Sequence, residues 1–224
     1  MSPIIFFLIM LILPLIAQIN VTSTFNKYKT VHNSRGLTAD QVARQILDSN
    51  GLYHIRVERI GGKLTDHFDP TANVIRLSDS VYGNTSVAAI GVAAHECGHA
   101  CQHAEDYAPI RLRTAIVPAV NVCSKLWYIT FLVGVLLLET FPMLATLGVL
   151  MFAAVVVFQL VTLPTETDAS GRALRTLEAE GILDYSEIPM AKKVLKAAAF
   201  TYIAALITSI MQLLRLLAML NRNN

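Results

Sequence analysis

Four long apolar segments constrain the fold of this chain more than any other feature. They cover residues 3–21, 118–138, 141–163 and 194–220. Each is long enough to cross the hydrocarbon core of a bilayer as a helix. Across the chain 54% of residues are hydrophobic and only 15% are charged, which is far more apolar than a soluble domain of this size usually is. We therefore predict a mainly α membrane protein with about four transmembrane helices.

The first segment carries no charged side chain and is predicted to be a retained transmembrane helix. The alternative is a cleaved signal peptide, but no basic residue precedes the apolar run and no clear cleavage site follows it. Only Glu139 and Thr140 separate the second segment from the third, so we expect these two to form a transmembrane hairpin. The fourth segment could instead lie in the membrane interface, but its length favours spanning.

The stretch between the first two apolar segments is polar and mixed, as in a soluble globular module. Thr38 and Gln41 form a capping-box pattern, which predicts a helix that ends at Gly51. The sequences HIRVERI, KLTDHFD and NVIRLSD follow, separated by turn residues, and predict a short antiparallel sheet. An edge strand of this sheet could accept a peptide as an added strand; the alternative is that it is only an edge.

This pattern divides the chain into five segments. They are the first transmembrane helix (1–24), the α+β module (25–117), the hairpin (118–163), a helix with its connector (164–193), and the fourth transmembrane helix with its tail (194–224). Because the hairpin crosses the membrane and returns, segment 164–193 is expected on the same side as the module.

The module contains the motif His95-Glu96-Cys97-Gly98-His99, about ten residues after the plausible N-cap pair Thr85-Ser86. On a helix, positions i and i+4 lie about 40° apart, so His95 and His99 face the same way and form half of a zinc site. Glu96 lies roughly 100° from His95 and is suited to act as general base toward a water nucleophile. The alternative is that these histidines are structural and the motif arises by chance.

A catalytic zinc ion takes three protein ligands and keeps one position for water, so one ligand is missing from the motif. His103 continues the histidine stripe but lies about 12 Å from His95 along the helix axis, too far to share the ion. Segment 164–193 offers Glu166, in the first turn of a helix predicted to run from Thr165 to about Glu180. Asp168 is the competitor; the alternative for Glu166 is a favourable interaction with the helix N-terminus.

The sequences AAHECGHACQ, LPTETDASGRAL, LTDHFDP and IRLS together resemble the YugP-like family of membrane-bound neutral zinc metallopeptidases, from about residue 30 to 180. The family is regarded as gluzincin-like, with one Zn²⁺ ion held by the HExxH histidines and a downstream glutamate. The resemblance implies His95, His99 and Glu166 as ligands and Glu96 as base. Related membrane gluzincins often carry an aspartate four residues after the ligand glutamate, where this chain has Ser170. What orients the histidines therefore stays open, with Asp168 as a candidate.

Peptide hydrolysis also needs a donor for the developing oxyanion. His67 lies in the family-like LTDHFDP stretch, and Arg172 lies less than two turns beyond Glu166. These two are the candidate donors. Alternatively, His67 stabilises its turn, and Arg172 pairs with a carboxylate or a lipid headgroup.

Basic residues flank the apolar segments unequally. The positive-inside rule therefore places the catalytic face in the cytoplasm and both termini outside. The net charge of +2 fits attraction to anionic lipid and gives no reason to expect nucleic-acid binding. The residues on the motif's side are Lys27, Lys29, Arg35, Arg111, Arg113, Arg172, Arg175, Lys192 and Lys193, against chiefly Arg222 on the other.

Together these features predict an integral, multi-pass membrane zinc metalloendopeptidase. Its partners would be the lipid bilayer and a peptide or protein substrate, including membrane-associated ones; no oligomeric state is predicted. A second hypothesis is a non-catalytic scaffold in which zinc ties a helix over 164–180 to a helix over 86–113. A structural zinc site would normally be closed by a fourth ligand, such as Asp168 or His67. A third hypothesis is a latent peptidase whose site is covered until a partner opens it.

Overall fold

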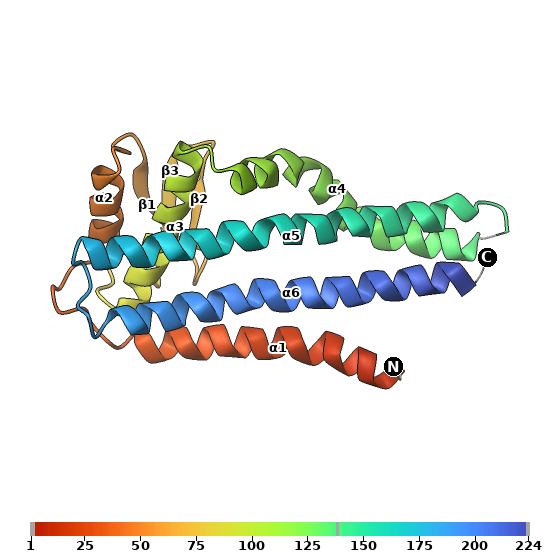
Figure 1. Ribbon diagram of the computed structural model, residues 1–224, viewed down its shortest axis with the longest axis horizontal. Coiled ribbons are helices and arrows are strands. Elements are labelled where there is room, and N and C mark those ends of the chain that lie inside the picture. Colours follow the sequence, from red (N-terminus) through yellow and green to blue (C-terminus); the bar gives the residue numbers. More distant parts are fainter. Residues whose placement is uncertain (1–2, 138, 223–224) are drawn as a thin grey trace. The chain divides into compact units, whose positions relative to one another are not determined.

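A computed structural model describes residues 3–137 and 139–222 of the chain (Figure 1). The described residues form long helices and one small sheet. In chain order the elements are α1 (Pro3–Tyr28), α2 (Ala39–Ser49), β1 (Arg56–Ile60), β2 (His67–Asp69), β3 (Val74–Ser78), α3 (Val87–Ala104), α4 (Ala108–Leu136), α5 (Pro142–Ala179) and α6 (Ile188–Arg222).

Helices α1, α4, α5 and α6 are long and apolar enough to cross a membrane, judged by length and composition. They contain nearly all of the four predicted spans, with residues 137 and 141 of the hairpin outside α4 and α5, and each helix is longer than its span because polar turns extend it. The fold class, a mainly α membrane protein with a small α+β module, is confirmed. The hairpin residue Leu138 lies outside the described residues.

The chain divides into two compact units, and α1, α5 and α6 contribute residues to both. The first comprises Met1–Ile16, Ala108–Pro164 and Tyr202–Asn224. In this unit α4 and α5 pack closely, since a Cβ atom on Gly148 would lie 2.6 Å from the backbone nitrogen of Phe131. Small residues permit such close approach between helices in a membrane. The buried cluster of this unit contains Phe131, Ala145, Val149, Phe152, Val156, Leu206 and Leu216.

The second unit comprises Ala17–Tyr107 and Thr165–Thr201. Its core lies between α2, α3 and the sheet, and it includes the fully buried side chains of Leu47, Ile75 and Ile90. Thr38 and Gln41 form the predicted capping box at the start of α2. The side chain of Ser86 caps α3 by accepting a hydrogen bond from the Ala89 amide. The unit thus has the mixed α+β character expected of the module.

The sheet has the strand order β1-β3-β2, with β3 in the centre. Strand β2 pairs antiparallel with β3, as predicted, with Phe68 opposite Ile75. Strand β1 pairs parallel with β3, with Val57 also opposite Ile75, so the prediction of an all-antiparallel sheet is wrong. The reason is that β2 lies on the far side of β3, and the consecutive strands β1 and β2 do not pair. The more buried strand β3 is thereby covered on both edges.

Two predicted helix boundaries are wrong. The helix expected over 86–113 breaks at Asp106, which has a φ of 54° between the end of α3 and the start of α4. The separate helix expected from Thr165 does not exist, because α5 continues through Pro164. A proline removes one helical hydrogen bond, but long membrane helices tolerate this interruption. Glu166 therefore lies inside α5, and the alternative that it serves a helix N-terminus no longer applies. The predicted stop at Gly181 is confirmed by its φ of 58°.

Candidate metal centre

Helices α3 and α5 bring together the side chains of His95, His99 and Glu166. One ligand atom from each lies within 4.8 Å of the other two. Oε2 of Glu166 is 3.2 Å from Nε2 of His95 and 3.5 Å from Nε2 of His99. Two histidines on one helix face therefore meet a carboxylate that follows them by about 70 residues in the chain.

The approach of the two helices depends on Gly98, inside the motif. A Cβ atom on this residue would lie 2.6 Å from the carbonyl oxygen of Ala169 on α5. Real Cβ atoms essentially never lie that close to a backbone atom. The lack of a side chain at Gly98 lets the α3 backbone touch α5 between the two histidines, and this contact brings Glu166 within reach of both rings.

Gln102, which is fully buried on α3, determines which nitrogen of His99 carries a proton. Its amide nitrogen donates hydrogen bonds of 2.8 Å to the Thr165 carbonyl oxygen and 2.8 Å to Asp168 Oδ2. Both of these groups are acceptors, so the Gln102 amide oxygen must face His99, 3.0 Å from Nδ1. Nδ1 of His99 therefore carries the hydrogen, and the neutral ring directs a lone pair on Nε2 toward Glu166.

His95 has an equivalent partner on α5. The hydroxyl oxygen of Ser170 lies 3.1 Å from Nδ1 of His95, where it can accept the Nδ1 hydrogen and leave Nε2 free to bind a metal. Ser170 lies four residues after Glu166, at the position where related membrane gluzincins often have an aspartate. Metal-binding histidines commonly have such a hydrogen-bond acceptor at the second ring nitrogen.

The donor set fits a zinc ion. With hydrogens on both Nδ1 atoms, the two Nε2 lone pairs face a carboxylate oxygen, an arrangement that is repulsive unless a cation or a proton lies between them. Burial alone would lower the pKa of His99, but the hydrogen bond to Glu166 and the charge of Glu96 raise this pKa above its ordinary value. The pocket therefore favours positive charge, and two imidazoles with one carboxylate are a common ligand set for zinc.

Glu96 lies beside the cluster and is 8% exposed. Its Oε2 atom accepts a hydrogen bond of 3.0 Å from the backbone N–H of Phe68, in β2. Within the described residues β2 is an edge strand, and this N–H points away from β3. The hydrogen bond holds the Glu96 carboxylate in place and sets the outer edge of β2 next to the cluster.

The two candidate oxyanion donors make other contacts. Arg172 donates to Asp168 Oδ2 at 2.6 Å and to Glu105 Oε2 at 2.7 Å, so it supports the acceptor that holds Gln102. His67 donates from Nδ1 to the Thr65 carbonyl oxygen at 2.9 Å. Its side chain lies on the face of β2 opposite to that of Phe68, because neighbouring residues in a strand alternate.

Two further residues lie outside the three-ligand cluster. Asp168 binds Gln102 and Arg172. It therefore contacts His99 only indirectly, through Gln102. The exposed ring of His103 packs edge-on against Phe68, with 5.9 Å between ring centroids. The geometric argument that excluded His103 as a ligand agrees with this position.

Sequence reasoning missed Gln102, Gly98 and the Phe68 amide. Gln102 carried a signal, because it lies three residues after His99 and therefore on the same helix face. Gly98 carried a weaker one as a glycine inside a helix. Nearly every residue has a backbone amide, so the sequence does not indicate which one contacts Glu96. The contact of Phe68 with Glu96 could not be predicted for this reason.

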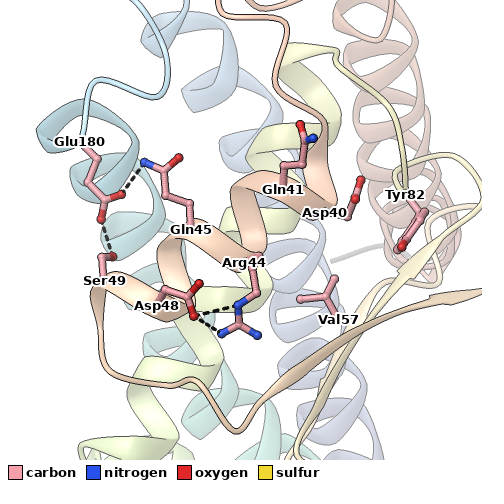
Figure 2. A pocket seen from close by; sticks show the side chains of 9 residues that line it. All are labelled: Asp40, Gln41, Arg44, Gln45, Asp48, Ser49, Val57, Tyr82 and Glu180. Carbon is pink, nitrogen blue, oxygen red and sulfur yellow. Dashed lines mark hydrogen bonds and ion pairs between the residues drawn. The ribbon is translucent and has the colours of Figure 1, made fainter.

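A hollow of about 830 Å³ lies beside α2, in the unit that contains the metal centre (Figure 2). Its lining contains none of the candidate site residues. Its charged groups have partners within the protein: Arg44 pairs with Asp48 at 2.8 Å, Glu180 accepts hydrogen bonds from Gln45 and Ser49, and Asp40 accepts one from the Gly83 amide. This hollow therefore lacks the convergence of two imidazoles and a carboxylate that marks the histidine cluster.

Comparison with known proteins gives two matches to this chain. Residues 3–221 match the protein family described as "Putative neutral zinc metallopeptidase". The chain is also 48% identical over 199 residues to a protein of Bacillus subtilis (strain 168) named "Putative membrane protease YugP". That alignment covers 89% of this chain and 88% of the relative. No solved structure matches the chain.

Proposed function

Because this chain belongs to the neutral zinc metallopeptidase family, we propose that it is an integral membrane zinc metalloendopeptidase. The observation that carries the proposal is the convergence of His95, His99 and Glu166, with ligand atoms within 4.8 Å of one another, beside the buried carboxylate of Glu96. This arrangement supports the proposal that the three residues act as zinc ligands and Glu96 as base, as in a gluzincin.

In this proposal the two Nε2 atoms and the Glu166 carboxylate would hold one zinc ion. When bound there, zinc would polarise the scissile carbonyl and make a water molecule more acidic. Ser170 and Gln102 would act as acceptors at the two Nδ1 atoms and so leave the Nε2 lone pairs for a metal, while Gly98 allows the close approach of α3 and α5.

Glu96 is the proposed general base. It takes a proton from the attacking water as the water oxygen bonds to the carbonyl carbon. It then delivers that proton to the amide nitrogen as the carbon–nitrogen bond breaks, so that a carboxylic acid and an amine leave. The Phe68 N–H binds one Glu96 oxygen and leaves the other for the proton transfer.

The substrate is proposed to bind along the outer edge of β2. A peptide added to this edge would pair with backbone groups of a strand that already contacts Glu96, so its scissile bond would be brought to the cluster. His67 and Arg172 stay the candidates for an oxyanion donor. The contacts of Arg172 favour a supporting role in the ligand network over a direct one.

The membrane arrangement is also proposed. Helices α1, α4, α5 and α6 would each cross the bilayer once, giving a multi-pass protein of the cell membrane. The excess of basic residues in the segments on the motif's side of the apolar spans supports a cytoplasmic catalytic face by the positive-inside rule. The substrates would be peptides or proteins at the cytoplasmic membrane surface, including membrane-associated ones.

The alternative is a structural zinc site in a scaffold protein. Such a site is normally closed by four protein ligands, whereas the metal-binding cluster found among residues 3–137 and 139–222 has three. Asp168 and His67, which could have closed it, bind Gln102 and the Thr65 carbonyl. This supports the catalytic proposal over the scaffold.

The proposal is tested by measuring zinc content and cleavage of an unstructured reporter protein on the same samples of detergent-solubilised protein. We expect the wild type to cleave, and Glu96→Gln to retain one zinc ion with activity reduced by about 100-fold or more. Glu58→Gln, on β1, is the matched control, because Glu58 is partly exposed and pairs with Arg56; this variant should cleave as the wild type does. Cleavage by Glu96→Gln at the wild-type rate would reject Glu96 as the base. If all three proteins bind zinc but none of them cleaves the reporter, the hypothesis of a structural scaffold or that of a latent peptidase would be favoured.

A further inference from the structure

A second pocket of about 350 Å³ lies between α1 and α6, within the unit that contains the metal centre. Lys27, Lys193 and Lys196 line it, together with the polar side chains of Asn20 and Thr24. The lining contains no acidic residue. Five potential donors therefore surround a hollow without any negative charge to balance them.

The lysines are available to a ligand. All three are exposed, and none forms an ion pair in the part of the chain that the structure describes. Lys27 contacts the ring of Tyr28, with its ammonium 5.6 Å from the ring centroid. Tyr28 and Ala197, which also line the pocket, are 7% and 4% exposed. Exposed cations thus surround a buried floor.

The sequence places this pocket at a polarity boundary of both helices. Lys27 is the first charged residue of the chain, after an uncharged stretch that makes up nearly all of α1. In α6 no charged residue occurs between Lys196 and Arg215. In both helices the long uncharged stretch therefore ends at residues that line this pocket. Each of the two helices is long and apolar enough to cross a membrane. Lipid headgroups occupy this level of a bilayer.

We propose that this pocket binds the phosphate group of an anionic phospholipid. The ammonium groups neutralise the phosphate, the Asn20 amide and the Thr24 hydroxyl donate hydrogen bonds to its oxygens, and the acyl chains follow the apolar surface of the adjoining helices. Basic pockets between membrane helices bind anionic headgroups for these reasons. The bound lipid would join α1 to α6 in the unit that carries the metal centre. The proposal is independent of the peptidase activity.

The test uses purified full-length protein in detergent, with bound lipid counted by native mass spectrometry. The probes are phosphatidylglycerol, which is anionic, and phosphatidylcholine, whose own cation offsets its phosphate. We expect phosphatidylglycerol to bind more tightly than phosphatidylcholine. Because each lysine near a headgroup contributes about 1 kcal/mol, Lys193→Gln with Lys196→Gln should weaken phosphatidylglycerol binding by about tenfold or more.

The matched control is the double variant Lys29→Gln with Lys192→Gln, which removes the same charge from neighbouring positions that do not line the pocket. It should bind phosphatidylglycerol as the wild type does. Equal losses in the two double variants would show a diffuse surface effect and overturn the proposal, as would unchanged binding in both. Soluble glycerol phosphate is the third probe. Binding of this probe as tight as that of phosphatidylglycerol would assign the pocket to a soluble anion and also overturn the proposal.

Discussion

Gln102 and His99 lie three residues apart on α3 and are joined by a buried hydrogen bond of 3.0 Å. The Gln102 amide also binds the Thr165 carbonyl and Asp168 on α5. One side chain therefore fixes the tautomer of a proposed zinc ligand and connects the two helices that supply all three ligands. The same arrangement makes Gln102 a positioning residue that can be tested without reference to catalysis.

We predict that Gln102→Leu weakens zinc binding by about 10- to 100-fold, the usual cost of losing an acceptor behind a metal-bound histidine. Zinc affinity is measured by competition with a chromogenic chelator. Activity should recover in excess zinc, because Gln102 contacts neither substrate nor the reacting atoms. Gln45→Leu is the matched control, since Gln45 binds Glu180 away from the cluster. Equal zinc affinity in the wild type and the Gln102 variant would contradict the role assigned to this amide.

A second prediction concerns Ser170, whose hydroxyl lies 3.1 Å from Nδ1 of His95. Replacing it by aspartate supplies a charged acceptor, and hydrogen bonds to a charged group are roughly twice as strong as neutral ones. Ser170→Asp should therefore raise zinc affinity, and Ser170→Ala should lower it. The two variants are compared by the same chelator competition. A fall in affinity in both would mean that the hydroxyl acts through helix packing and not as an acceptor.

The parts of the site that sequence could predict are those set by local geometry. The i, i+4 spacing of His95 and His99 follows from the helix alone, and the alternation of apolar and polar segments predicted that Glu166 could reach them. The four apolar spans were equally evident, because a bilayer demands a minimum length of uncharged helix.

The rest depended on tertiary packing. The continuation of α5 through Pro164 could not be predicted, because a proline favours a helix start as readily as it is tolerated inside a long helix. The parallel pairing of β1 with β3 arises from the position of β2 on the far side of the sheet. The partners of the two histidines, Gln102 and Ser170, depend on how α3 and α5 align at Gly98, which no local pattern specifies.

That alignment gives a third prediction. A methyl group at Gly98 would lie 2.6 Å from the Ala169 carbonyl, whereas one at Gly91 on the same helix would lie 3.6 Å from the Ala191 side chain, an ordinary contact. Gly98→Ala should destabilise the protein by about 1–3 kcal/mol and lower its zinc content. Gly91→Ala should be neutral or slightly stabilising, because alanine is the better helix former. Thermal unfolding and bound zinc are measured for both. Equal behaviour of the two variants would show that α3 and α5 can separate without losing the site.

The fourth prediction isolates the backbone amide of Phe68, which donates to Glu96. Phe68→Pro removes this donor, and β2 should tolerate the proline because an edge strand has N–H groups that make no ladder bond. Phe68→Leu keeps the donor and removes the same aromatic ring, so it is the matched control. We expect the proline variant to hold zinc as the leucine variant does, but to show a kcat lower by about tenfold, since the base loses a hydrogen bond to a charged group. If both variants cleave equally well with equal zinc content, the orientation of Glu96 does not require this amide.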